Sequence, residues 1–196
     1  MSGVNPRTLA ELVRSVLERA ASFQWTVQGF GMLRTKLADV GRIHIWDSRL
    51  RVPLVSDIHA HPWSLRSHIV SGELLNQRFS EAGGSKGYLP YMRSIIATGE
   101  GGGLVGQPRE VWLAAHETEF YTAGSTYDQR AEEIHRSIPI DGTVTVLERQ
   151  MGPPLEETLV YWPRGTNWVS AEPRPATAAE VARSVQYALA RWSAGS

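Results

Sequence analysis

The feature that most constrains the fold is a series of short strand-like segments between about residues 30 and 164. Turn signals separate the segments, among them Ser71-Gly72 and Asp141-Gly142. The segments are GMLRTKLA (31–38), RIHIWDS (42–48), SHIVSG (67–72), ELLNQRF (73–79), YMRSIIAT (91–98), EVWLAA (110–115), TEFYTAG (118–124), EEIHRSI (132–138), TVTVLER (143–149) and TLVYWPR (158–164). Short strands with regular turns are typical of a β-sandwich or barrel, and IDGTVTV predicts a tight hairpin. We therefore predict an all-β barrel over about residues 30–164.

Helical patterns flank these segments on both sides. Before them, Asn5 is a candidate N-cap, Pro6 suits the first helical position, and apolar residues recur at helical spacing to about residue 22. After them, Thr177 and Glu180 form a capping-box pair that opens a helix of about residues 177–193. The sequence shows no internal repeat. We expect a single domain over residues 1–196, with both helices packed outside the barrel.

Composition and charge exclude several classes of function. The chain has 20 basic and 20 acidic residues and no block of like charge, so we expect no nucleic-acid or membrane partner. It has no cysteine, which excludes disulfides, thiolate metal ligands and a cysteine nucleophile. No signal peptide or long apolar run is present, so we expect a cytoplasmic protein. The stretch GEGGGLVGQP lacks the ending of a phosphate-binding loop and is interpreted as a hairpin connection.

Two histidines two residues apart, His59 and His61, are the strongest chemical signal. In a strand, residues i and i+2 point to the same face, so both imidazoles can approach one point inside a barrel. A third ligand is needed to hold a divalent metal well. Two histidines with a third group and open positions suit Fe(II), and also Zn, Ni or Mn. The alternative is that both are ordinary polar residues near a strand end.

The surrounding sequence resembles the cupin superfamily, the double-stranded β-helix proteins. HAHPWSLRSHIVSGEL (59–74) resembles the first cupin motif, with both histidines and Gly72 at the family's spacing and Leu65 where the family has a glutamate. YTAGSTYDQRAEEIHRSIPIDGTVTV (121–146) resembles the second motif, with Gly124 in the turn and His135 as the histidine. The resemblance implies a cupin barrel with a metal inside it.

Cupins that lack the glutamate and use three histidines resemble the thiol dioxygenases, such as cysteine dioxygenase. This resemblance implies Fe(II) on His59, His61 and His135, with open positions for substrate and O2. The last barrel strand of that group presents serine, histidine and tyrosine inward, whereas the matching residues here are Thr145, Leu147 and Arg149. We therefore expect an oxygenase that acts on a small anionic molecule other than a thiol.

Two alternatives of other classes remain open. In one, the metal acts only as a Lewis acid in an isomerase, cyclase or lyase, for which Zn, Ni or Mn would serve. In the other, the chain is a metal-free cupin that binds a small molecule or a partner. By analogy with cupins, we also expect a homodimer.

Several further residues are candidates for the site. Tyr127 and Arg149 are predicted to act in catalysis, the first as a hydrogen-bond donor and the second from the inward face of the last strand. The predicted substrate-binding residues are Arg66 and Arg78, whose guanidinium groups can hold an anion, and Trp63, which can form a wall of the site.

The remaining histidines and one acid are given structural roles. His44 shares strand parity with Arg42 and Trp46 and is expected to pack inside the barrel, although it could line the pocket. His68 should face away from the metal unless a bulge reverses its strand. His116 is expected on the surface, in a turn, and Glu73 is expected to be structural, with a role as a fourth ligand as the alternative.

Overall fold

Two antiparallel sheets and two terminal helices make up the computed structural model, which describes residues 6–37, 40–53, 55–84, 86, 88–97, 104–167 and 173–194. The first sheet contains, in order, β13 (Arg174–Pro175), β1 (Thr26–Gln28), β2 (Phe30–Leu37), β3 (Gly41–Arg51), β11 (Val144–Arg149), β5 (Leu65–Ser71) and β9 (Thr126–Gln129). The second contains β10 (Ile134–Pro139), β4 (Ile58–His59), β12 (Glu157–Pro163), β7 (Leu89–Ala97), β8 (Leu104–Thr122) and β6 (Glu73–Ala82), and β6 also pairs with β10. The mostly β architecture with a helix near each end confirms the predicted class.

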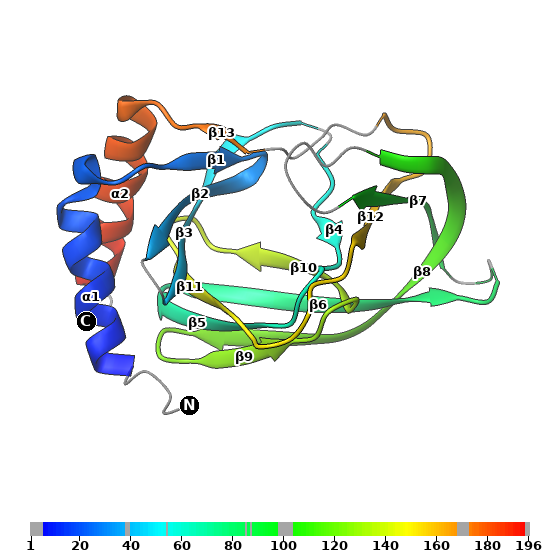
Figure 1. The fold of residues 1–196 in the computed structure, drawn as a ribbon, viewed down its shortest axis with the longest axis horizontal. Helices are drawn as coiled ribbons and strands as arrows, with labels where there is room; N and C mark the ends of the chain where they lie inside the picture. Colours follow the sequence, from blue (N-terminus) through cyan, green and yellow to red (C-terminus); the bar gives the residue numbers. More distant parts are fainter. Residues whose placement is uncertain are drawn as a thin grey trace.

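The helices lie side by side against one face of the first sheet (Figure 1). Helix α1 spans Pro6–Glu18 and is followed by a short 3-10 helix, η1 (Ala20–Ser22), while α2 spans Ala178–Ala194. The main apolar core fills the space between these helices and the sheet; its fully buried members include Leu9, Val13, Val16 and Leu17 of α1, Ile43 and Ile45 of β3, Val144 and Val146 of β11, and Ala188 of α2. Burying each large aliphatic side chain contributes about 1.5–3 kcal/mol. The other face of this sheet carries a second, smaller apolar cluster that includes Met32, Trp46 and Ile69, and it also carries polar and charged side chains.

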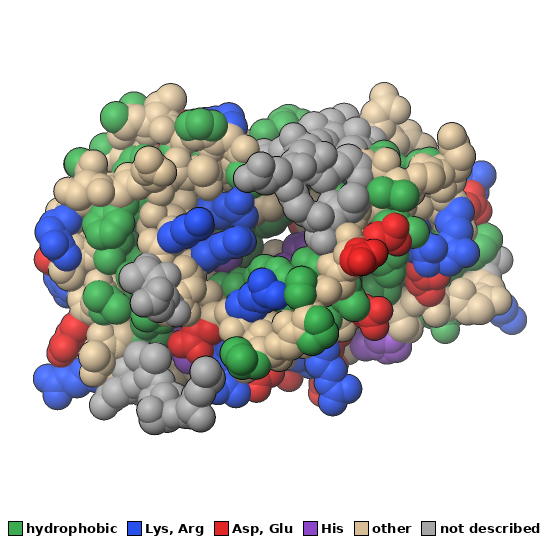
Figure 2. All heavy atoms as spheres, in the orientation of Figure 1, with side chains coloured by type: hydrophobic (Ala, Val, Ile, Leu, Met, Phe, Trp, Pro, Cys, Tyr) green, Lys and Arg blue, Asp and Glu red, His purple; other side chains and the backbone are tan. Residues whose placement is uncertain are grey.

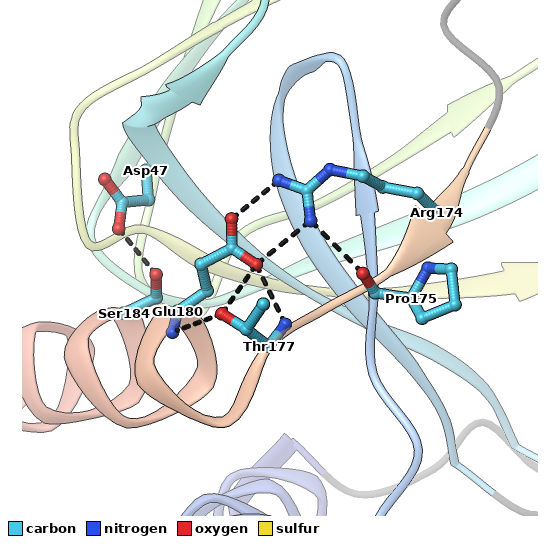
Figure 3. A network of polar contacts seen from close by, with 6 residues as sticks. All are labelled: Asp47, Arg174, Pro175, Thr177, Glu180 and Ser184. Carbon is cyan, nitrogen blue, oxygen red and sulfur yellow. Dashed lines mark hydrogen bonds and ion pairs between the residues drawn. The ribbon is translucent and has the colours of Figure 1, made fainter.

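Helix α2 begins at the capping box that the sequence predicts (Figure 3). The Glu180 carboxylate accepts hydrogen bonds from the Thr177 backbone N–H at 2.8 Å and from Arg174, and the Glu180 N–H donates to the Thr177 hydroxyl at 3.2 Å. One turn further on, the Ser184 hydroxyl donates to the buried Asp47 carboxylate of β3. These contacts fix the start of α2 and its position on the first sheet. Asn5, the predicted N-cap of the first helix, lies outside the described residues.

The predicted IDGTVTV hairpin is wrong. The turn at Asp141-Gly142 forms, but it carries the chain from β10 in the second sheet to β11 in the first. The reason is that the turn is attached to β3: Asp141 accepts hydrogen bonds from the Ser48 backbone N–H at 2.8 Å and the Ser48 hydroxyl at 2.6 Å, and Gly142 N–H donates to Trp46 O at 2.8 Å. A local turn signal does not specify which strand pairs with which.

The turn predicted at His116 is also wrong. Residues 110–115 and 118–124 were expected as separate strands, whereas most of this stretch is one long strand, β8. The pairing of β6 with β8 shifts between Gln77 and Phe79, so that His116 and Glu117 oppose the single residue Arg78 in a β-bulge. In the GEGGGLVGQP stretch, residues 104–108 belong to β8, and residues 99–103 lie outside the described residues. Among the helices described, none is long and apolar enough to cross a bilayer.

Candidate metal centre

Three histidines from two paired strands and the segment after one of them converge in the interior. His59 ends β4 and His61 follows two residues later, while His135 lies on β10 directly opposite His59. One nitrogen of each ring lies within 4.8 Å of those of the other two. His61 Nε2 and His135 Nε2 are 3.0 Å apart. The backbone pairing therefore brings together the three side chains that the sequence predicts.

Hydrogen bonds from the backbone and from one amide set the orientation of two of the rings. His59 Nδ1 lies 3.1 Å from the Asp57 carbonyl oxygen, which can only accept, so Nδ1 carries the proton and Nε2 presents a lone pair. His135 Nδ1 lies 2.9 Å from Asn76 Oδ1, in the interior of β6. A metal ligand is held in this way when its second ring nitrogen donates to a fixed acceptor.

A chain of amides determines which way Asn76 faces. The Glu133 carbonyl accepts from Gln129 Nε2 at 3.3 Å, so Gln129 Oε1 must face Asn76 Nδ2, which donates to it at 3.2 Å. Asn76 Oδ1 is thereby turned toward His135, whose Nδ1 donates to it. A backbone carbonyl can only accept a hydrogen bond. The Glu133 carbonyl at the end of this series therefore fixes which group donates and which accepts in each of the three hydrogen bonds. His135 Nε2 consequently presents a lone pair toward His61 Nε2, which lies 3.0 Å away.

The three imidazoles are held neutral. Burial lowers the pKa of His59, and it lowers the pKa values of His61 and His135 well below the usual value, with a further contribution from the neighbouring histidines. Removing an imidazolium from water is costly, so the uncharged form is favoured. Neutral imidazole with a free lone pair is the form that binds a metal ion.

The donor set fits a divalent transition metal. Imidazole nitrogens suit Fe, Zn, Ni and Cu, and three of them leave further positions open. With metal–nitrogen bonds of about 2.1 Å, two nitrogens at right angles around one ion are about 3.0 Å apart. His61 Nε2 and His135 Nε2 have this spacing. No carboxylate belongs to the group among the described residues, and buried Leu65 stands where the cupin motif has its glutamate.

Aromatic rings enclose the histidines on two sides. Phe30 of β2 stacks on His59 with ring centroids 5.6 Å apart, and Trp63 stacks on His61 at 5.4 Å. The guanidinium group of Arg42, on β3, lies over the Trp63 ring, with its carbon 6.0 Å from the ring centroid. Trp63 thus lies next to the three histidines, and its predicted role in substrate binding stays a prediction. It also connects the histidines to the charged face of the first sheet.

A cavity of about 180 Å³ opens beside Trp63. It is lined by Lys36, Gly41, Arg42, Trp63, Leu147 and Arg149. Arg149 therefore lies on the inward face of β11, where strand alternation places it. Figure 2 shows the hollow on this face, with Lys and Arg side chains along one rim and histidine visible within it.

The other predicted site residues are engaged elsewhere. Arg66 of β5 forms a two-pronged ion pair with Asp128, at 2.8 and 3.0 Å, on the surface. Arg78 of β6 contacts Glu119 at 2.6 Å and Glu133 at 2.7 Å. Tyr127 is buried and stacks on Tyr121 at 4.5 Å; burial raises its pKa, with the opposing effect of hydrogen bonds to Ser67 and Ser137. The structure does not bring these three to the lining of the cavity, and their roles in substrate binding and catalysis stay predictions.

The remaining histidines lie outside the group of three. His44 is buried on the face of β3 that also carries Arg42 and Trp46, and its Nε2 has no hydrogen-bond partner. His68 faces Thr126 Oγ1 at 3.0 Å and Glu148 at 3.2 Å, so it points away from the centre. His116 is exposed and lies 2.6 Å from Ser80 Oγ. The Glu73 backbone pairs with Thr143 beside the turn at Gly72, which fits a structural role.

Sequence reasoning did not find two groups of residues at the centre. Asn76 and Gln129 belong to strands that meet only in three dimensions, so nothing in their local sequence connects them to His135. Arg42 and Lys36 did carry a signal. They share strand parity with residues that face the interior, and they form one cross-strand pair in the β2–β3 register.

Comparison with known proteins yields no match: no family model, no curated protein and no solved structure is significantly similar to this chain. The resemblance to cupins therefore stays an expectation from the motif residues.

Proposed function

We propose that this protein is a metal-dependent enzyme of the cupin type, in which His59, His61 and His135 hold Fe(II) for the oxygenation of a small anionic molecule. The observation that carries the proposal is the convergence of three neutral imidazoles, of which two have tautomers fixed by their hydrogen bonds. Structural histidines do not need their lone pairs directed at one another. Two antiparallel sheets with the histidines in the interior are compatible with a double-stranded β-helix.

Charge is the main argument for an anionic substrate. Three neutral ligands leave the full charge of a divalent ion uncompensated within a partly buried site, where electrostatic interactions are stronger than in water. Arg42 and Arg149 add positive charge on the cavity wall. An anion that enters the cavity is attracted both by the metal ion and by these two arginines.

The residues of the chain divide the work at such a site. Fe(II), when bound, supplies adjacent open positions for substrate and O2 and passes electron density between them. Asn76 holds the His135 ring in place, and Phe30 and Trp63 pack on the other two rings and keep water from them. Arg42 and Arg149 orient the substrate by its negative charge. By the same analogy we propose a homodimer, which the molecular mass in solution tests.

Nitric oxide is a suitable probe, because it binds Fe(II) only where a coordination position is open. We expect protein loaded with one Fe(II) per chain under nitrogen to give the EPR signal of an iron–nitrosyl centre, and His59→Ala to lose both the iron and the signal. His116→Ala, which removes an exposed histidine, is the matched control. Wild-type protein that binds iron without any nitrosyl signal would contradict an oxygenase. In that case the Lewis-acid alternative is tested by activity under nitrogen with Zn or Ni.

A further inference from the structure

Four cationic side chains occur on one face of three adjacent strands in the first sheet. Arg34 and Lys36 belong to β2, Arg42 to β3 and Arg149 to β11. Lys36 pairs across the sheet with Arg42, which in turn pairs with Leu147, two residues before Arg149. Strand alternation places all four opposite the apolar face that packs on the helices. We call Lys36, Arg42 and Arg149, which line the cavity, the cationic wall.

No acidic side chain of the described residues forms an ion pair with any of these cations. Arg34 donates to the neutral acceptors Thr26 Oγ1 at 3.1 Å and Gln28 Oε1 at 3.0 Å, and Arg42 lies over the Trp63 ring. This differs from Arg66 and Arg78, whose guanidinium groups contact carboxylates. Unpaired guanidinium groups held close together are unfavourable in the free protein.

Burial and neighbouring positive charge both act on two arginines of this face. Burial lowers the pKa of Arg34 to about 10, with a further contribution from Arg42, and burial followed by Arg149 lowers the pKa of Arg42. With a pKa of about 10, Arg34 remains charged at neutral pH. His44 and Trp46, on the same face of β3, each have a buried ring nitrogen without a hydrogen-bond partner. This face of the sheet therefore has an excess of positive charge and unused polar groups.

The cationic wall adjoins the three-histidine centre. Trp63 contacts both, because its ring stacks on His61 and lies beneath the guanidinium group of Arg42. The cavity of about 180 Å³ has room for one small charged group. A ligand bound there would lie beside the metal centre.

We propose that Lys36, Arg42 and Arg149 form a subsite for a phosphate group of the substrate, next to the three-histidine centre. This deepens the proposed function, on which it rests, by naming the substrate class as a small phosphorylated molecule. A carboxylate has one negative charge and is satisfied by one guanidinium fork. A phosphate dianion has three strong acceptor oxygens and about two charges, which matches two arginines and a lysine on one wall.

Inorganic phosphate is the probe, titrated calorimetrically into metal-free protein at about pH 8, where phosphate is a dianion. We expect saturable binding at one site per chain, with acetate at least about tenfold weaker. Arg42→Gln and Arg149→Gln should each weaken phosphate binding about tenfold or more, which corresponds to the loss of one charge-assisted contact. Arg14→Gln, on the exposed side of α1, makes the same change of charge away from the cavity and should leave binding unchanged.

Lys36→Gln controls for misfolding of the two arginine variants. Because Lys36 is exposed, we expect this variant to keep its fold and still to bind phosphate more weakly. Absence of saturable phosphate binding, equal binding of acetate, or unchanged binding in the folded variants would overturn the subsite. Metal content is measured separately on the same preparations. A protein that binds metal without phosphate refutes only the subsite, whereas one that binds phosphate without metal refutes the proposed function.

Discussion

Asn76 is the residue that determines which nitrogen of His135 faces the other two histidines. Its own orientation follows from Gln129 and the Glu133 carbonyl, so a backbone group fixes a metal ligand through two side-chain amides. Asn76 is fully buried. If its amide were flipped, its oxygen would face the Gln129 oxygen and its NH2 group would face the His135 N–H, and both hydrogen bonds would be lost at a high free-energy cost.

Replacing Asn76 should affect the metal centre more than the fold. In Asn76→Ala the His135 Nδ1–H loses its acceptor, and metal affinity should fall about 10–100-fold. The free energy of unfolding should fall by about 1–3 kcal/mol because a buried donor is left unpaired. Competition with a chelator and urea denaturation measure the two effects. Asn167→Ala, at an exposed position, is the control, and equal metal affinity in the two variants would show that the amide chain has no role.

His44 gives the protein a characteristic loss of stability in acid. Burial, followed by Arg34 and Arg42, lowers its pKa to about 3. The unfolded chain takes up a proton at His44 near pH 6.5, whereas the folded protein does not. The contribution of His44 to the unfolding free energy is therefore constant above about pH 6.5, and the folded protein loses stability as the pH falls from about 6.5 to about 3.

A variant with phenylalanine at this position isolates the effect. His44→Phe keeps a ring against Trp46 but cannot be protonated. Between about pH 6.5 and pH 5, wild-type protein should lose about 2 kcal/mol more of its unfolding free energy than His44→Phe. Urea denaturation at both pH values gives the comparison. Parallel pH profiles for the two proteins would mean that His44 is accessible to water.

At the scale of elements, the connections place the histidines. β5 and β6 meet at Gly72, with φ of 82°, and Thr143, the residue before β11, packs against it. The Thr143 hydroxyl both accepts from Glu73 N–H at 3.0 Å and donates to Glu73 O at 2.8 Å. This junction connects β6, which carries Asn76, to the first sheet.

Gly72→Ala should be strongly destabilising. A Cβ there would lie 2.8 Å from the Thr143 Cα and would require a backbone conformation that alanine disfavours. The unfolding free energy should fall by at least about 2 kcal/mol, measured by urea denaturation. Gly83→Ala is the matched control, since nothing lies within 4 Å of its Cβ position. If both variants lose the same stability, the close approach at Gly72 is not a constraint.

Some elements could be predicted from the sequence and others could not, for identifiable reasons. Period and capping are local, so both helices and most strands could be located, and the Thr177–Glu180 box forms as predicted. Pairing is not local. The Asp141-Gly142 turn joins two sheets because Ser48 and Trp46 bind it, and the break expected at His116 is a bulge because the long β6 continues alongside.

At the scale of the whole molecule, the two faces of the first sheet do different work. One face packs on α1 and α2 and forms the largest apolar core, and the other carries the cationic wall. The second sheet supplies His59, His135 and Asn76. The three histidines could be predicted because two lie two residues apart, a spacing that places side chains on one face of a strand, and the third was assigned through the resemblance of residues 121–146 to a family motif. Asn76 and Gln129 could not be assigned, since they reach the site only through the packing of strands, whereas the strand parity of Arg42 was a signal that could have been used.

Metal content tests the central claim most directly. Untagged protein reconstituted with Fe(II) under nitrogen, then dialysed, is analysed by inductively coupled plasma mass spectrometry beside His135→Ala and the exposed control His116→Ala. We predict about one metal ion per chain in the wild type and in His116→Ala, and a loss of at least about tenfold in affinity in His135→Ala. Wild-type protein without metal, or His135→Ala that retains a full equivalent, would contradict the convergence of the three histidines on one ion.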